Sequence, residues 1–158
     1  MIFALLSFLF FIALEAFFAL SEMALISAER LSLQRRAKNE RIARIALKLL
    51  DNPERLFTTT IMGITMSIAG NAVFTSYFFI SSLGNAGAIF SLLIPIFTFF
   101  FGQAFPKVIG KTYSQTLVLI VAPILYLMSF LFYPVYHLNQ RLTNLISRKK
   151  KTIALYLL

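Results

Sequence analysis

Basic residues are absent from two long stretches of this 158-residue chain, positions 1–29 and 57–106. Both stretches are strongly apolar, and the whole chain is 59% hydrophobic with a mean hydropathy of +0.81. A soluble domain of this size cannot bury so much apolar surface, so lipid must cover much of it. A bilayer core about 30 Å thick needs roughly 20 apolar residues per helix. We therefore expect an all-α integral membrane domain whose main partner is the lipid bilayer.

A net charge of +9 would suggest nucleic-acid binding in a soluble protein. Here the basic residues are confined to segments between and after the apolar stretches, which indicates membrane topology, so no nucleic-acid partner is expected. Cysteine is absent, which excludes disulfides, thiolate nucleophiles and thiolate metal ligands. The single histidine, His137, cannot form a soft-metal site alone.

The first span is predicted at about residues 2–26. We interpret it as a mature span because a signal peptide would begin with basic residues, and because Glu15 interrupts its apolar run. Residues 28–50 form a predicted cytoplasmic amphipathic helix on the membrane surface, acting either as a solvated basic helix or as a ligand-binding element. Its apolar stripe follows helical spacing at Ile42, Ile45, Ala46, Leu49 and Leu50.

The second span is predicted at 54–80. Asn52 can cap a helix start, and Pro53 and Glu54 suit its first turn. An uncharged turn over 81–87, rich in Ser and Gly, then leads to a third span at about 88–106.

The last long segment, 113–146, is apolar enough to cross once more, but Pro123 and Pro134 are expected to break it. Basic residues lie both before and after it, and a crossing would put them on opposite sides. We therefore predict an interfacial belt, followed by a basic tail over 148–158. The domain, residues 1–147, would cross the plasma membrane three times, with its N-terminus outside and its C-terminus in the cytoplasm.

Each predicted span carries polar groups, which are costly at membrane depth and normally face a protein interior or a cavity. On the first span, Glu15, Ala19 and Glu22 share one face and Ser21 lies beside it. Glu22 can equally lie at the cytoplasmic interface.

On the second span, Gly63, Ser67 and Asn71 recur every four residues, with Gly70 adjacent and Thr65 nearby. This side of the helix suits either a ligand site or close helix packing through small residues.

The third span ends in Gly102 and Gln103, shortly before Pro106. Pro106 has no N–H to donate, which leaves the Gly102 carbonyl available as a cation ligand. The alternative is an ordinary proline kink, with Lys107 reaching the headgroups. All three spans thus offer hard oxygen atoms near one cytoplasmic depth, which suit magnesium or calcium, with sodium as a rival.

In combination, four sequence landmarks resemble the CNNM/CorC group of magnesium transporters, specifically its membrane domain. They are the segments 16–27, 52–55, 63–65 and 102–107. The resemblance implies three membrane helices with a belt, a homodimer, and a Mg²⁺ site open to the cytoplasm, with no organic cofactor. Its implied ligands are Ser21, Thr65, Ser67, Asn71, Gly102 and Gln103, supported by Glu22, Gly63, Gly70, Pro106 and Lys107.

The chain departs from the family pattern at several positions. Gln103 stands where the family usually has Glu, Ile64 and Thr65 replace a pair that usually contains Asn, and Glu15 replaces a small residue. Family members usually continue into cytoplasmic CBS domains that bind nucleotide, so such a regulatory domain is an expected partner.

Two functions follow from these observations. The first is a gradient-driven transporter of Mg²⁺ or a related cation, since there is no Walker-type nucleotide loop. The second is a membrane anchor or regulatory homologue that has lost the site. No enzyme is expected, because the spans contain no Ser–His or paired-Asp arrangement that could activate a nucleophile.

Overall fold

The computed structural model describes residues 2–137, and every regular element in that part of the chain is a helix. The predicted all-α membrane fold is confirmed. The elements are α1 (Ile2–Ser27), α2 (Arg30–Ala37), α3 (Arg41–Leu50), α4 (Pro53–Leu83), α5 (Asn85–Thr98), the π-helical segment η1 (Phe99–Ala104), α6 (Phe105–Thr112) and α7 (Ser114–Leu131).

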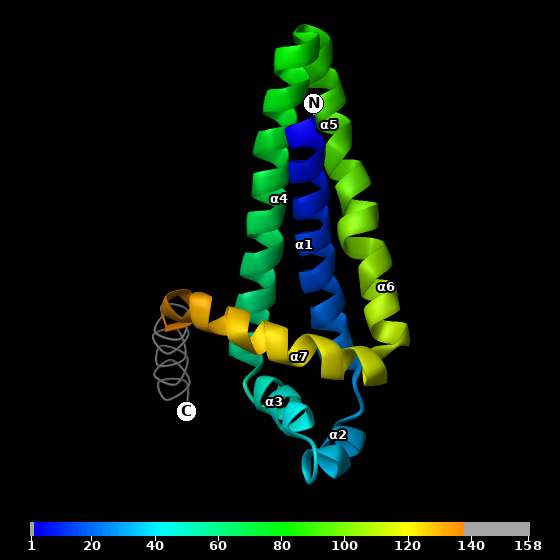
Figure 1. Ribbon diagram of the computed structural model, residues 1–158, viewed down its shortest axis with the longest axis vertical. Helices are drawn as coiled ribbons and strands as arrows, with labels where there is room; N and C mark the ends of the chain where they lie inside the picture. The colour runs from blue at the N-terminus through cyan, green and yellow to red at the C-terminus, as the bar shows by residue number, and fades with distance from the viewer. Residues whose placement is uncertain (1, 138–158) are drawn as a thin grey trace, which may run out of the picture.

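A long bundle forms the body of the domain, and α7 lies across its lower end (Figure 1). The bundle consists of α1, α4 and the continuous run α5–η1–α6, while α2 and α3 lie below it. By length and composition alone, four segments within residues 2–137 could cross a membrane: Leu5–Ser27, Pro53–Leu83, Ser91–Thr112 and Ser114–Leu131. The first three form the bundle. The fourth is α7, which we predicted as an interfacial belt rather than a span.

Helix α4 starts as the sequence predicts. The Asn52 side chain accepts a hydrogen bond from the Arg55 N–H at 3.3 Å, and Pro53 and Glu54 occupy the first turn. The helix runs on to Leu83, so the predicted turn over 81–87 is much shorter than expected. Gly84 alone separates α4 from α5, and it can do so because it adopts a positive φ of 58°.

The predicted single helix over 28–50 is wrong, because the structure has two helices there. The break falls at Lys38, Asn39 and Glu40, and Glu40 has an extended backbone before α3 begins. Asn is a poor residue for a helix interior, because its side chain competes for backbone hydrogen bonds. The buried stripe of α3 is also rotated from the predicted one, with Ile42 exposed and a core of Ala43, Ala46 and Leu49.

The third span does not end at Pro106 as predicted, since the helical run continues to Thr112. The six residues before α6, Phe99–Ala104, are wound as a π-helix. Here the Phe105 N–H bonds the Phe100 carbonyl, five residues back instead of four. This wider turn comes directly before Pro106, where an α-helical hydrogen bond cannot form.

Helix α7 passes through Pro123 without breaking, contrary to prediction, and ends at Leu131. Proline is tolerated in membrane helices because neighbouring groups compensate for the missing bond. After a turn at Phe132 the chain is helical again over 133–137. The remainder of the predicted belt and the tail over 148–158 lie outside the described residues.

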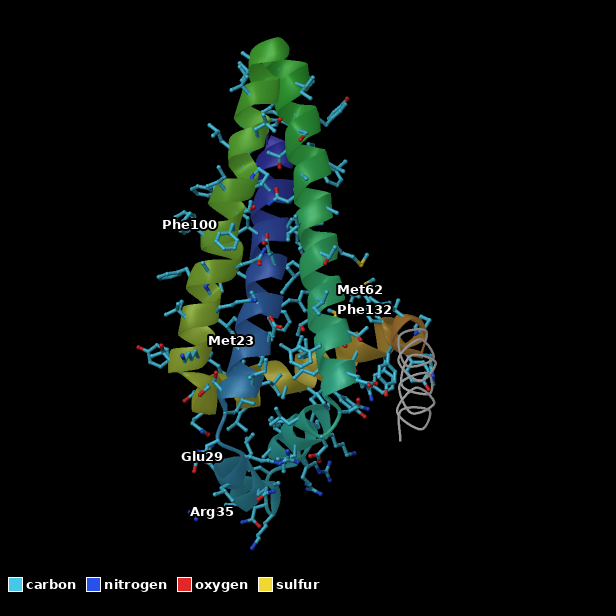
Figure 2. The ribbon with its side chains drawn as sticks, turned by 180° about the vertical axis from the view of Figure 1, so that it is seen from behind. Met23, Glu29, Arg35, Met62, Phe100 and Phe132 are labelled. Atoms are coloured by element: carbon cyan, nitrogen blue, oxygen red, sulfur yellow. The ribbon has the colours of Figure 1, made fainter. Side chains whose placement is uncertain are left out.

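The apolar core lies at the α7 end of the bundle. Leu25 of α1, Leu56 of α4 and Leu125 of α7 are buried there together with the apolar face of α3. Higher up, large apolar side chains such as Phe100 point away from the bundle (Figure 2). Lipid can cover this surface in a membrane.

Candidate cation site

The most extensive helix contact in the bundle is the seam between α1 and α4. Phe18 lies against Gly63 and Phe11 lies against Gly70, so the two helices are antiparallel. A Cβ atom added at Gly63 would come within 2.5 Å of the Phe18 ring, and one at Gly70 would overlap the Phe11 ring. Both glycines predicted as supporting residues therefore serve close helix packing.

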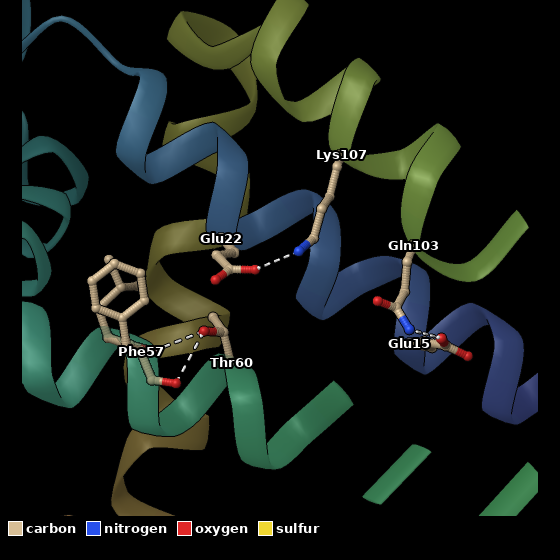
Figure 3. Close-up of polar contacts among 7 residues, drawn as sticks. Glu15, Glu22, Phe57, Thr60, Gln103 and Lys107 are labelled. Carbon is tan, nitrogen blue, oxygen red and sulfur yellow. Dashed lines mark hydrogen bonds and ion pairs between the residues drawn. The ribbon is translucent and has the colours of Figure 1, made fainter. Parts of the chain in front are cut away.

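A fully buried carboxylate, that of Glu15, lies between these two aromatic contacts on α1. The Gln103 side-chain amide donates a hydrogen bond to its Oε1 atom at 2.8 Å (Figure 3). The carboxyl group lies against Gly102, where an added Cβ would come within 2.7 Å of the carboxyl carbon. Within the described residues, the Oε2 atom has no hydrogen-bond partner.

Ser67 lies between Gly63 and Gly70 on α4, as Glu15 lies between Phe11 and Phe18 on α1. The two side chains are therefore at a similar depth in the seam. Ser67 is fully buried, and its hydroxyl donates to the Gly63 carbonyl at 2.7 Å. That bond uses the hydroxyl proton and leaves the oxygen lone pairs able to accept.

Asn71, one turn further along α4, is also buried. Its side-chain oxygen accepts a hydrogen bond from the Thr75 hydroxyl at 2.8 Å. Its amide nitrogen has no hydrogen-bond partner within the described residues. Asn71 thus combines an oxygen that is already engaged with a buried N–H₂ group that a cation would repel.

The expected gathering of the ligands at one depth is not seen. Ser21 is buried, and its hydroxyl donates to the Phe17 carbonyl at 2.6 Å. It lies beyond Phe18, on the side away from Asn71, and Asn71 is itself eight residues beyond Gly63. Eight residues of α-helix rise about 12 Å, so Ser21 and Asn71 cannot share one small ion within this single chain.

Thr65 does not join the seam, because its side chain is exposed. It is two residues from both Gly63 and Ser67, and two residues turn an α-helix by about 200°. The prediction that Thr65 is a ligand therefore has no support from the side of α4 on which it lies.

The structure thus brings three of the predicted positions, Ser67, Gly102 and Gln103, to one level of the bundle and separates the others. It adds Glu15, whose role the sequence left open. The signal that could have identified it is its unique charge, since 57–106 and the first 14 residues contain no ionisable side chain other than tyrosine.

A family model, the cyclin M transmembrane N-terminal domain, matches residues 6–154. The chain belongs to this family. No curated protein sequence matches it significantly.

The cyclin M domain also carries an ion pair at the α7 end of its bundle. The Lys107 ammonium lies 3.2 Å from Glu22, linking α6 to α1 (Figure 3). Lys107 therefore does not simply extend to the headgroups. Nearby, Gly110 packs against the Leu20 carbonyl, and Pro106 is buried.

Residues 2–137 of this cyclin M domain contain no cluster of side chains that would hold a soft metal. Among the described residues, no three His, Cys, Asp or Glu side chains lie together. At the level of Glu15 the bundle contains one carboxylate, the Gln103 amide and the Ser67 hydroxyl. Such oxygen groups suit Mg²⁺, Ca²⁺ or Na⁺.

Proposed function

We propose that this domain binds Mg²⁺ or a related divalent cation and carries it across the membrane. Support comes from its membership of a metal-transport family and from the line of buried oxygen-bearing side chains inside a bundle otherwise built from apolar residues. The second observation carries the proposal, since polar groups at membrane depth mark ion pathways. Transport is proposed in place of enzymatic catalysis, with no organic cofactor.

The proposed setting is the plasma membrane, with the N-terminus outside. A homodimer is proposed because the resemblance to the family implies one. A cytoplasmic CBS-type domain is the proposed regulatory partner.

One observation favours a second candidate, a non-transporting anchor or regulatory subunit. The predicted ligands are spread along the seam, and the amide of Gln103 carries no charge at a position where the family usually has Glu. In that case, deletion of the protein would leave the magnesium content of cells unchanged, whereas loss of a transporter would alter it.

The direct test is calorimetric titration of Mg²⁺ into the purified protein in detergent. We expect saturable binding by wild type that is weakened in Ser67→Ala, and Ser21→Ala and Asn71→Ala test the two predicted ligands that lie at other depths. Ser7→Ala is the matched control, because Ser7 makes the same type of bond, to the Phe3 carbonyl at 2.8 Å, but this bond is exposed and lies about two helical turns from Glu15. Absence of binding to a folded wild-type protein would favour the anchor.

A further inference from the structure

Glu15 is an acidic residue inside the helix bundle, where a charge is energetically unfavourable. Its side chain is fully buried, and no Asp, Glu, Lys or Arg occurs among the first 14 residues or between 57 and 106. The Lys107 ammonium is paired with the Glu22 carboxylate, so Lys107 neutralises Glu22. A buried carboxyl group that has no countercharge among the described residues must take up either a proton or a cation.

Only one of the two carboxylate oxygens of Glu15 has a hydrogen-bond partner among the described residues. The Gln103 amide fixes the Oε1 atom through its 2.8 Å hydrogen bond, while Oε2 is buried and has no partner within the described residues. Gly102 has no side chain, and this absence gives the carboxyl group the room it occupies. The orientation of Glu15 is thus set by one oxygen and leaves the other available.

Oxygen atoms of three elements lie at this depth. They belong to Glu15 on α1, to the side-chain carbonyl of Gln103 on η1 and to the hydroxyl of Ser67 on α4. The Gln103 amide turns its N–H₂ group to Glu15, so the donors open to a cation are the Glu15 carboxylate and the Ser67 hydroxyl (Figure 3). Both are hard oxygen ligands that suit a small divalent cation.

We propose that Glu15 is the anionic ligand of the transported cation, binding it through Oε2 while Gln103 holds Oε1 in place, with the Ser67 hydroxyl as a neutral donor at the same depth. This inference rests on the proposed function and names the charged group that it requires. In this chain the negative charge at the level of η1 comes from α1, and the residue on η1 itself supplies an amide.

The test is Mg²⁺ titration of the purified protein, followed by calorimetry and by the magnesium-dependent rise in melting temperature. Glu15→Gln removes the charge but keeps an oxygen that can accept from Gln103. We expect its Mg²⁺ affinity to fall about tenfold or more, with the thermal shift lost and the helix content unchanged. Glu29→Gln is the matched control, because Glu29 is exposed just before α2.

The exchanged variant Glu15→Gln with Gln103→Glu returns one carboxylate and one amide to the pair. We expect its affinity to recover to within about threefold of wild type. It also decides the question if Glu15→Gln alone does not fold. A folded exchanged variant without Mg²⁺ binding, or Glu15→Gln that binds like wild type, would overturn the assignment and leave Glu15 as a structural contact between α1 and η1. Wild type without saturable binding would overturn the proposed function itself.

Discussion

At the scale of single residues, the domain depends on positions where a side chain is small or absent. Gly63 and Gly70 admit the rings of Phe18 and Phe11, and Gly102 admits the carboxyl group of Glu15. Each contact lets α1 approach a neighbouring helix closely enough for dispersion forces to act. In lipid, where apolar burial does not drive helix association, such packing is a main source of cohesion.

Gly63→Ala tests this packing. The added methyl group would overlap the Phe18 ring, which is itself buried and has little room to move. We expect a loss of about 1–3 kcal/mol in the free energy of unfolding, measured by denaturant titration in mixed micelles. Ala69→Val, on the exposed face of the same helix, should change stability far less. Equal effects in both variants would show that the seam is not tightly packed.

At the scale of elements, one arginine connects the start of α4 to α7. The Arg55 side chain donates to the Ser129 hydroxyl at 2.9 Å, and its guanidinium lies 4.8 Å from the ring centre of Tyr126 and 4.9 Å from that of Phe130. The Asn52 amide also donates to the Tyr136 hydroxyl at 3.3 Å. Helix α7 is therefore fastened across the bundle by polar and cation–π contacts as well as by apolar ones.

Arg55→Ala should release α7 from the bundle. Loss of one hydrogen bond to a charged donor and two ring contacts predicts a destabilisation of about 2–3 kcal/mol. Hydrogen–deuterium exchange should rise in α7 and remain unchanged at the seam of α1 with α4. Arg55→Lys should rescue only in part, because an ammonium group cannot reproduce the planar stacking of guanidinium. Unchanged exchange in α7 would show that its apolar contacts suffice.

The helices also show which parts of the fold and of the candidate site could be predicted from the sequence. The cap at Asn52 and the repeat of Gly63, Ser67 and Asn71 are local signals. They were enough to predict a helix start and a helix face that suits close packing or a ligand. The contact of Glu15 with Gln103 joins residues 88 positions apart. This contact depends on how the two helices are rotated and at what depth each lies, and the helical periodicity of the sequence determines neither. The break between α2 and α3 and the π-turn were missed because weak propensities and small register changes decide them.

At the scale of the whole molecule, the arrangement of charge predicts its orientation. The exposed basic residues of α2 and α3 lie beyond the lower end of the bundle, and Arg35 lies near the lower end of the whole molecule (Figure 2). The hairpin between α4 and α5 at the opposite end carries no charge. The positive-inside rule therefore predicts that α2 and α3 face the cytoplasm and the hairpin faces outward.

The absence of cysteine makes this orientation directly measurable, since single cysteines can be placed without background. An impermeant maleimide should label Ser81→Cys on intact cells, and should label Asn39→Cys only after permeabilisation. The side chains of Ser81 and Asn39 are exposed, and so is that of Leu131 at the end of α7. Leu131→Cys should behave like Asn39→Cys if α7 is an interfacial belt. Its labelling on intact cells would show that α7 crosses the membrane.

The π-turn at η1 gives the third bundle helix a freedom that a regular helix lacks. A π-turn holds one residue more than an α-turn, and each residue of an α-helix corresponds to about 100° of rotation. If the surplus residue moved past Gln103 along the helix, the Gln103 side chain would swing away from Glu15 while the helix axis kept its direction. Release of the carboxylate would then require only a local exchange of backbone hydrogen-bond partners, without separation of the packed helices.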